Sequence, residues 1–260
     1  MDRKLFHAAR QARCSVRAVA GAFFGRNMFM VRRFASAPMA ICALLLLGAG
    51  SAAAERTQTR KVEDALEVFN AITSIPERDA VQQLMKNTYA LAIFPDVQKV
   101  SFVIGGQRGK GVLIVRQSDG SWSRPLFLTL SGASVGWQIG VQSADILLFF
   151  RTRRSVDAVL KGRYTLGVGA SVAAGSLGRS AGAATDIDMK AEIYSYSRTR
   201  GIFAGVSLDG VSLDVDADAN SAYYGRDIEK PSDVLEATSL SDPPSAVALC
   251  RAVAAWEKAE

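Results

Sequence analysis

The chain has 260 residues, of which 49% are hydrophobic and 22% charged, so it is long and apolar enough for a buried core and is not an intrinsically disordered chain. The formal net charge of +6 does not indicate binding to nucleic acid, because the excess lies in residues 1–54. Of the 31 Lys/Arg and 25 Asp/Glu of the chain, eight and one lie there, which leaves 23 and 24 in the remainder.

Residues 1–54 have the composition of an export signal. Two arginines precede an apolar run over residues 39–49, and a series of small residues ends at Ala54. A basic region, an apolar region and an Ala-x-Ala site are the parts of a cleaved signal peptide, and the apolar run is short for a membrane span. We therefore expect cleavage near Ala54, a start near residues 28–30, and an exported protein in the periplasm or cell envelope.

Cleavage would also remove the residues that most catalytic and metal-binding sites need. His7 is the only histidine, and Cys250 is the only cysteine that would remain. Without histidine the chain loses Ser-His-Asp, Cys-His and most zinc chemistry, and a single cysteine forms no internal disulfide. We therefore predict that it is not an enzyme and has no catalytic residue, no metal and no cofactor.

Helical periodicity opens the remaining chain. Apolar residues recur at helical spacing from residue 57 to 75, and the polar face carries several acids. A helix that lies on an anionic bilayer has a basic polar face instead, so we expect this helix to pack on the body of the fold. Pro76 suits the start of a second helix.

The centre of the chain is a glycine-rich segment, Gly105–Gly111, between two apolar runs. β-branched residues on both sides of closely spaced glycines predict a β-hairpin whose turn lies at these glycines. Arg108 and Lys110 lie on the predicted turn. They either keep an ordinary hairpin tip in water or contact an anionic surface.

The elements that follow are short. We expect a second turn at 118–121, strands at 122–130, 131–142, 145–150, 192–197, 201–206 and 211–215, and helices at 151–160, 232–240 and 245–258. Helices at both ends and strands without βαβ alternation predict an α+β fold. The sheet is expected to be a curled antiparallel sheet or a barrel-like core, in a single domain from residue 55 to 260.

A dense basic cluster, Arg151, Arg153 and Arg154, directly follows the most apolar strand. Cations are unfavourable at the N-terminus of a helix, so an anionic partner would compensate them, although a solvated helix start is the simpler alternative. Each Lys or Arg near an anionic membrane contributes roughly 1 kcal/mol to binding. These residues, with Arg108 and Lys110, are the candidate lipid-binding site.

Charge is segregated along the chain. Residues 97–164 contain ten Lys/Arg and three acids, and residues 185–242 contain five Lys/Arg and twelve acids. If the two segments form different faces, one face of the molecule is strongly positive and the other strongly negative. If they pair within one sheet, the opposite charges lie side by side and neither face has a large net charge.

Three possible motifs are rejected on their context. Gly132–Gly136 matches G-x-S-x-G, but no histidine and no helix pattern follow it. Gly105–Gly111 lacks the spacing of a phosphate-binding loop. The acids from Asp214 to Asp218, with Asn220, lack the glycine and the final Glu of a calcium loop, so we expect a strand with a solvated acidic face.

Many of these segments together resemble one known family. They are Ala92–Pro95, Gly105–Gly111, Gly120–Pro125, Ser134–Gly140, Asp145, Ala174–Arg179, Tyr194–Ser197, Gly201–Gly205, Asn220 and Tyr223–Gly225. The chain is similar to the SYLF domain family over nearly its whole predicted mature length. The resemblance implies lipid binding, of phosphoinositides in eukaryotic members, actin binding in fungal members, and no catalytic residues.

Two functions follow as hypotheses. The first is a non-enzymatic envelope protein that binds an anionic phospholipid membrane surface through Arg108, Lys110, Arg151, Arg153 and Arg154, and that binds no nucleic acid. The alternative is a structural or carrier module that holds a small apolar ligand or supports an envelope assembly. Actin enters only through the resemblance, and an exported bacterial protein would not meet actin in its own cell.

Overall fold

The computed structural model describes residues 36–74, 78–162, 164–167, 172–174, 191–198, 208, 210–237 and 240–258. The chain divides into two units, Met1–Gly50 and Ser51–Glu260. The second unit contains the sheet. The predicted leader falls largely outside the described residues, and cleavage near Ala54 stays a prediction.

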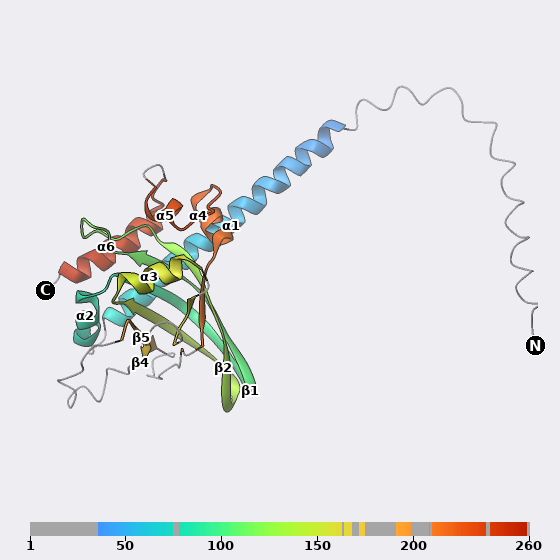
Figure 1. The fold of residues 1–260 in the computed structure, drawn as a ribbon. Helices are drawn as coiled ribbons and strands as arrows, with labels where there is room; N and C mark the ends of the chain where they lie inside the picture. The colour runs from blue at the N-terminus through green and yellow to red at the C-terminus, as the bar shows by residue number, and fades with distance from the viewer. Residues whose placement is uncertain are drawn as a thin grey trace, which may run out of the picture. The chain divides into compact units, whose positions relative to one another are not determined.

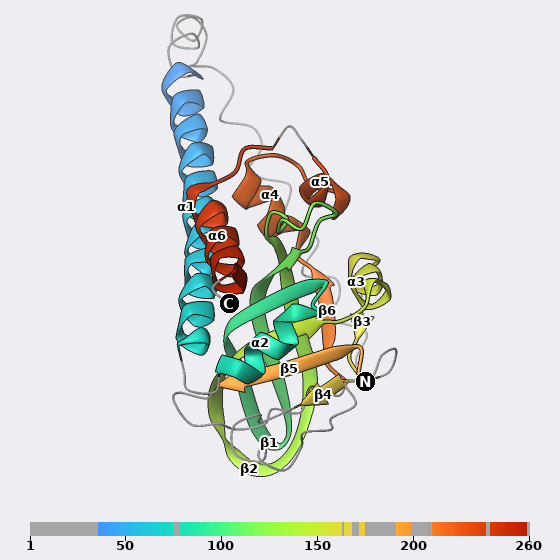
Figure 2. The ribbon, with the colours of Figure 1, turned by 90° about the vertical axis from the view of Figure 1, so that its left-hand side faces the viewer.

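One long antiparallel pair forms the body of the sheet. Strand β1 (Ala90–Val115) pairs with β2 (Leu126–Phe150) from Ala90 opposite Phe150 to Leu113 opposite Leu126. The other strands are β3 (Tyr164–Thr165), β4 (Val172–Ala174), β5 (Ile193–Arg198) and β6 (Ser212–Val215), in the order β3-β6-β2-β5-β4 with β1 also on β2. Among the described strands, β4 alone pairs in parallel, with β5. Figures 1 and 2 show the curled sheet that results.

The described helices precede, interrupt and follow the sheet. They are α1 (Ser36–Thr73), α2 (Arg78–Lys86), α3 (Arg153–Leu160), α4 (Ala217–Tyr224), α5 (Ser232–Leu235) and α6 (Pro244–Lys258). The α+β class with a curled antiparallel sheet is therefore confirmed. Within the described part of the chain, no helix is both long and apolar enough to cross a membrane.

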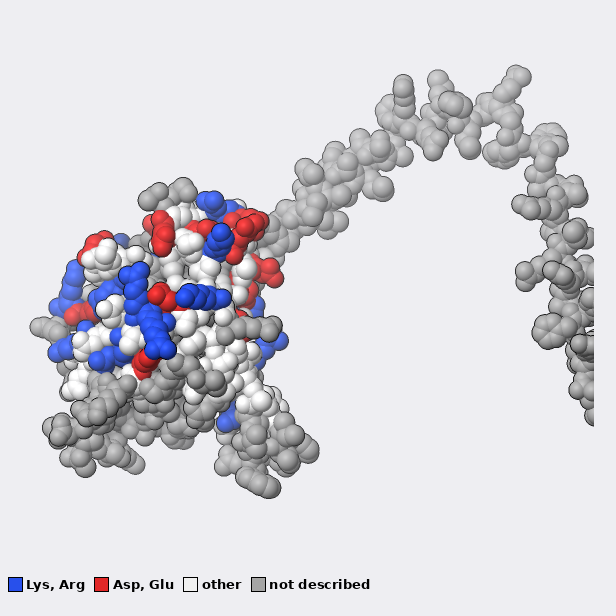
Figure 3. All heavy atoms as spheres, in the orientation of Figure 1, with Lys and Arg blue, Asp and Glu red and all other residues white. Residues whose placement is uncertain are grey.

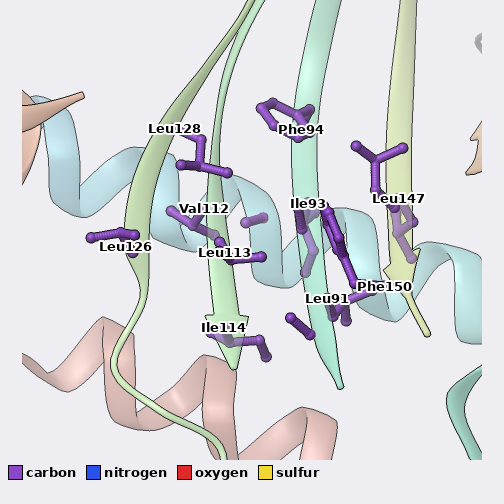
Figure 4. Close-up of a cluster of buried hydrophobic side chains, with 14 of the residues drawn as sticks. Leu91, Ile93, Phe94, Val112, Leu113, Ile114, Leu126, Leu128, Leu147 and Phe150 are labelled. Atoms are coloured by element: carbon purple, nitrogen blue, oxygen red, sulfur yellow. The ribbon is translucent and has the colours of Figure 1, made fainter. Parts of the chain in front are cut away.

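The core lies between the sheet and the helices at the two ends of the chain. Figure 4 shows buried side chains of β1 and β2, among them Ile93, Leu113 and Phe150, crowded together over the helices. Phe69 of α1 meets Trp256 of α6 edge to face, with ring centroids 5.9 Å apart. The predicted helix at 57–75 therefore packs on the body of the fold, as its acidic polar face indicated.

The predicted hairpin turn at Gly105–Gly111 is wrong. These residues lie inside the β1–β2 ladder, where Gly105 pairs with Ser134 and Gly111 with Leu128. The chain reverses at the predicted second turn instead: the amide of Gln117 donates to the carbonyl of Ser121 over 2.8 Å, and Gly120 has φ +84°. That turn joins β1 to β2.

Close packing inside β1 explains why glycine occurs at positions 109 and 111. A Cβ on Gly109 would lie 2.7 Å from Cγ2 of Val97, and one on Gly111 would lie 2.6 Å from Cδ1 of Phe94. Strand β1 therefore curls back so that its second half packs against its own first half. Glycine is needed there for space, not for a left-handed turn.

Several boundaries also differ from the prediction. The segments 122–130, 131–142 and 145–150 form one continuous strand from Leu126, because all three pair with β1. The expected strand with alternating acids ends at Val215, and helix α4 follows it. The helix at 232–240 stops at Leu235, and the expected strand at 201–206 lies outside the described residues.

Candidate functional site

Arg108 and Lys110 lie on β1, two residues apart, so their side chains leave the same face of the strand. Arg108 pairs with Ser131 and is exposed. Lys110 is 46% exposed, and its Nζ lies 2.8 Å from Oδ2 of Asp216. The first cation is open to solvent, and the second already has an acidic partner.

Asp216 is built into the fold through both carboxylate oxygens. Oδ1 accepts the amide of Ala219 over 3.0 Å at the start of α4, and Oδ2 accepts hydrogen bonds from Lys110 and from the hydroxyl of Thr129. Burial by itself would raise the pKa of Asp216, but these hydrogen bonds and the Lys110 charge outweigh burial and hold the pKa below its ordinary value. Asp216 is thus a charged helix cap that neutralises Lys110.

Arg151 connects β2 to α3. Its amide donates to the carbonyl of Glu192 over 2.8 Å, and its guanidinium carbon lies 5.8 Å from the centre of the Tyr194 ring. The side chain is half-buried. It therefore contributes to packing at the end of β2 and offers little charge to a surface outside the protein.

Arg153 and Arg154 begin α3 and are both exposed. Thr152 caps the helix, with its hydroxyl accepting the amide of Ser155 over 3.2 Å. The first turn contains no acid, so two cations face the positive end of the helix dipole without compensation from their own helix. Over the described ranges, neither these arginines nor Arg108 form an ion pair.

The sheet relates Arg108 to α3. A row of directly paired residues runs from Arg108 through Ser131 and Ser212 to Thr165, across β1, β2, β6 and β3. Helix α3 immediately precedes β3 in the chain and lies beside β6 (Figure 2). The exposed cations thus stand on strands and a helix that neighbour one another.

The two oppositely charged segments do not form separate faces. Strand β2, in the basic segment, pairs with β5 and β6, in the acidic one. Arg124 Nε also lies 2.5 Å from Oδ1 of Asp242, a second ion pair between the segments besides Lys110–Asp216. Basic and acidic side chains accordingly lie beside one another on the face drawn in Figure 3. The candidate basic surface reduces to Arg108, Arg153 and Arg154.

Another group of cations gathers where the strand ends meet. Lys86, Arg116 and Arg151 line an open cavity of about 570 Å³, with Glu192 and the half-exposed Tyr89 on its wall. Arg116 also forms an ion pair with Glu257 and stacks 4.5 Å from the Trp122 ring. These cations are distant in the chain and no local sequence pattern joins them, so the sequence alone does not predict that they meet.

The G-x-S-x-G segment does not form a nucleophile elbow. Ser134, the central residue of G-x-S-x-G, lies inside β2 opposite Gly105. A nucleophile elbow needs a strand, a tight turn and a helix, and here the strand continues on both sides. The described residues also contain no cluster of three His, Cys, Asp or Glu that could hold a metal ion.

Comparison with known proteins shows to which family the chain is similar. Residues 131–256 match the Ysc84 family, described as "Las17-binding protein actin regulator". LAS seventeen-binding protein 3 of Saccharomyces cerevisiae is 33% identical over 175 residues, which cover 65% of this chain and 38% of that protein. Protein YSC84 of the same yeast is 32% identical over 201 residues, or 75% of this chain and 42% of the relative.

The human SH3 domain-containing YSC84-like protein 1 is 32% identical over 176 residues, covering 66% of this chain and 51% of that protein. The matched region therefore spans about half or less of each relative's length. The family description and the name of LAS seventeen-binding protein 3 refer to binding and regulation, and none of these names refers to an enzymatic activity.

Proposed function

Because this chain carries a domain of the SYLF (Ysc84) family, we propose that it is a non-enzymatic protein that attaches reversibly to an anionic phospholipid surface. The observation that carries the proposal is the pair Arg153 and Arg154, exposed at the start of α3 with no acid in the first turn. An anionic headgroup would compensate charges that the helix itself disfavours.

The expected strength follows from the number of free cations. Arg108, Arg153 and Arg154 at an anionic membrane would each contribute roughly 1 kcal/mol, which gives reversible attachment and not permanent anchoring. Lys110 and Arg151 contribute less in this proposal, because one is paired with Asp216 and the other packs on Tyr194. Attachment should weaken as salt screens the charges.

The export signal predicted from residues 1–54 leads us to place this function at the bacterial envelope, after cleavage near Ala54. The partner would then be the anionic phospholipid of an envelope membrane. N-terminal sequencing of the protein recovered from a cell fraction tests this location. A cytoplasmic protein that retains residues 1–54 would contradict it.

Charge reversal tests the lipid-binding proposal. We expect Arg108→Glu, Arg153→Glu and Arg154→Glu together to abolish co-sedimentation with vesicles that contain about a third phosphatidylglycerol. A matched control reverses three exposed cations elsewhere, Arg60, Arg251 and Lys258. The control carries the same change in net charge, so it should retain binding. Equal loss in both variants would show a net-charge effect and no site.

The family description supplies a second candidate, since its members are described as Las17-binding actin regulators. Co-sedimentation with filamentous actin tests whether this chain shares that partner. The carrier alternative has less support, because side chains of β1 and β2 fill the space between the sheet and the helices (Figure 4). Native mass spectrometry would detect a retained apolar ligand and so revive it.

A further inference from the structure

The middle of the β1–β2 pair is a two-stranded ribbon without further partners among the described strands. Strand β5 pairs with β2 only from Asp145 to Phe150, and β6 pairs with it only from Leu128 to Ser131. Residues 132–144 of β2 therefore pair only with β1 over this part of the chain. Figures 1 and 2 show this part of β1 and β2 projecting away from α4, α5 and α6.

The projecting ribbon exposes an apolar pair. Val100 of β1 and Val141 of β2 are directly opposite in the ladder, and their side chains are therefore neighbours on one face. They are 50% and 69% exposed. The other exposed large apolar residues of the described chain, Tyr89 and Val247, lie at separate places, before β1 and on α6.

The charge pattern of the ribbon favours one kind of partner. Residues 97–107, which pair with residues 132–144 of β2, include Lys99 and no acid, and residues 132–144 include no charged residue at all. The next charged residues along β1, Arg108 and Lys110, are also cations. Exposed ribbons of water-soluble proteins normally carry charges that discourage contact. This one combines exposed valines with few charges, all of which are cations.

The acids that flank the ribbon in the sequence, Asp96 and Asp145, lie at its base and form hydrogen bonds there. The amide of Asp96 donates to Oδ1 of Asp145 over 3.0 Å, and the hydroxyl of Ser143 donates to the Asp96 carboxylate. Asp96 has φ +53°, and the register between β1 and β2 shifts beside it. The acids thus mark the end of the ribbon next to the body of the sheet, away from its middle.

From this arrangement we propose that the β1–β2 ribbon is a membrane anchor whose valine pair, Val100 and Val141, enters the interfacial layer of an anionic bilayer. Arg108, an exposed cation of the same strand directly after the ribbon, contacts the headgroups. This inference rests on the proposed attachment to lipid, and it adds an apolar contact that the basic residues alone do not provide. Aliphatic side chains in the interface contribute binding that salt does not screen.

The test is a conservative double substitution in the full chain, Val100→Thr with Val141→Thr. Threonine keeps the β-branched shape and therefore the strand, but it replaces one methyl group with a hydroxyl. We expect the partition coefficient onto vesicles with about a third phosphatidylglycerol to fall about tenfold, an effect that follows from the lost apolar transfer. The matched control is Val247→Thr, an exposed valine on α6, and its partition should not change.

Salt dependence separates the two contributions. The wild type should keep residual binding at about 0.5 M salt, where charge contacts are screened, and the double variant should lose it. Equal partition of wild type and double variant at both salt concentrations would overturn the anchor and leave lipid attachment standing. No partition of the wild type onto any anionic vesicle would overturn both. A double variant that changes only its oligomeric state, seen by size-exclusion chromatography, would show that the ribbon contacts a second copy, which also contradicts the anchor.

Discussion

Lys110 and Asp216, 106 residues apart in the chain, meet with Nζ 2.8 Å from Oδ2. The contact joins β1 to the start of α4, and it brings a residue of the basic segment onto a residue of the acidic one. Asp216 also caps α4 through the amide of Ala219. One carboxylate thus performs two tasks that substitutions can separate.

Asp216→Ala should destabilise the protein by about 2 kcal/mol, because it removes both the cap and the ion pair. Asp216→Asn should cost less, about 0.5 kcal/mol, since asparagine is a good cap and only the ion pair with the half-exposed Lys110 is lost. Urea unfolding at pH 7 measures both values. Equal costs for the two variants would contradict the division between cap and ion pair.

The pKa of Asp216 predicts a pH dependence. Its folded pKa lies below the ordinary value, so ionised Asp216 adds stability that is fully present above the unfolded pKa of about 3.9. This contribution disappears as the pH falls through the folded pKa. The stability difference between wild type and Asp216→Asn should therefore be constant from pH 7 to about pH 5 and shrink toward pH 2. A difference that grows on acidification would contradict the sign of the shift.

Asn220 makes a second long-range contact, to the start of β2. Its Oδ1 accepts the amide of Phe127 over 2.9 Å, and its Nδ2 donates to the carbonyls of Phe127 and Asp216. The side chain is fully buried. Asn220→Ala should destabilise the protein by about 3 kcal/mol, because buried backbone groups lose their partners. Thermal unfolding tests this, with the exposed Asn70→Ala as a control that should change little.

These contacts show why the sequence predicted the elements better than their arrangement. The buried strand at 145–150 and the helix that follows it appear as expected, because a continuous apolar run and a helical period are local signals. Asp216 was expected on an alternating strand, but the partner that fixes its role is Lys110, far away in the chain. A local pattern carries no information on such a pairing.

The same limit applies to the candidate site. All five cations were identified from their positions in the chain. Whether each of them has a partner within the protein depends on residues that are distant in the sequence and adjacent only in the folded structure. Tyr194 stacks on Arg151, and Asp216 pairs with Lys110. The assignment of these residues to lipid binding stays a prediction that the charge-reversal experiment tests.

Cys250 should be an unreactive thiol. Burial raises its pKa to about 11, and its Sγ lies 3.2 Å from the carbonyl oxygen of Ser123. Below that pH the thiol stays protonated, and only the thiolate reacts readily. At pH 8 we expect iodoacetamide to modify Cys250 about a hundredfold more slowly in the folded protein than in urea, as measured by peptide mass spectrometry. Similar rates in the two states would contradict the burial of the thiol.

Gly111 and Gly106 provide a matched test of how β1 curls. A Cβ on Gly111 would collide with the carbonyl oxygen of Ile93 and lie 2.6 Å from Cδ1 of Phe94, whereas a Cβ on Gly106 would meet its nearest atom at 3.7 Å. Gly111→Ala should therefore destabilise the protein by about 3 kcal/mol or more, because backbone and core must shift. Gly106→Ala should change the free energy of unfolding by less than about 1 kcal/mol.

Urea unfolding of both variants measures the difference, and the result bears on the turn as well as on packing. If Gly105–Gly111 formed a solvated hairpin turn, alanine would be tolerated at Gly111 about as well as at Gly106. A large cost confined to Gly111 is expected only if the two halves of β1 pack against each other, which is the curl that leaves the middle of the ribbon projecting. Equal small costs would therefore undermine both the observed curl and the membrane anchor inferred from it.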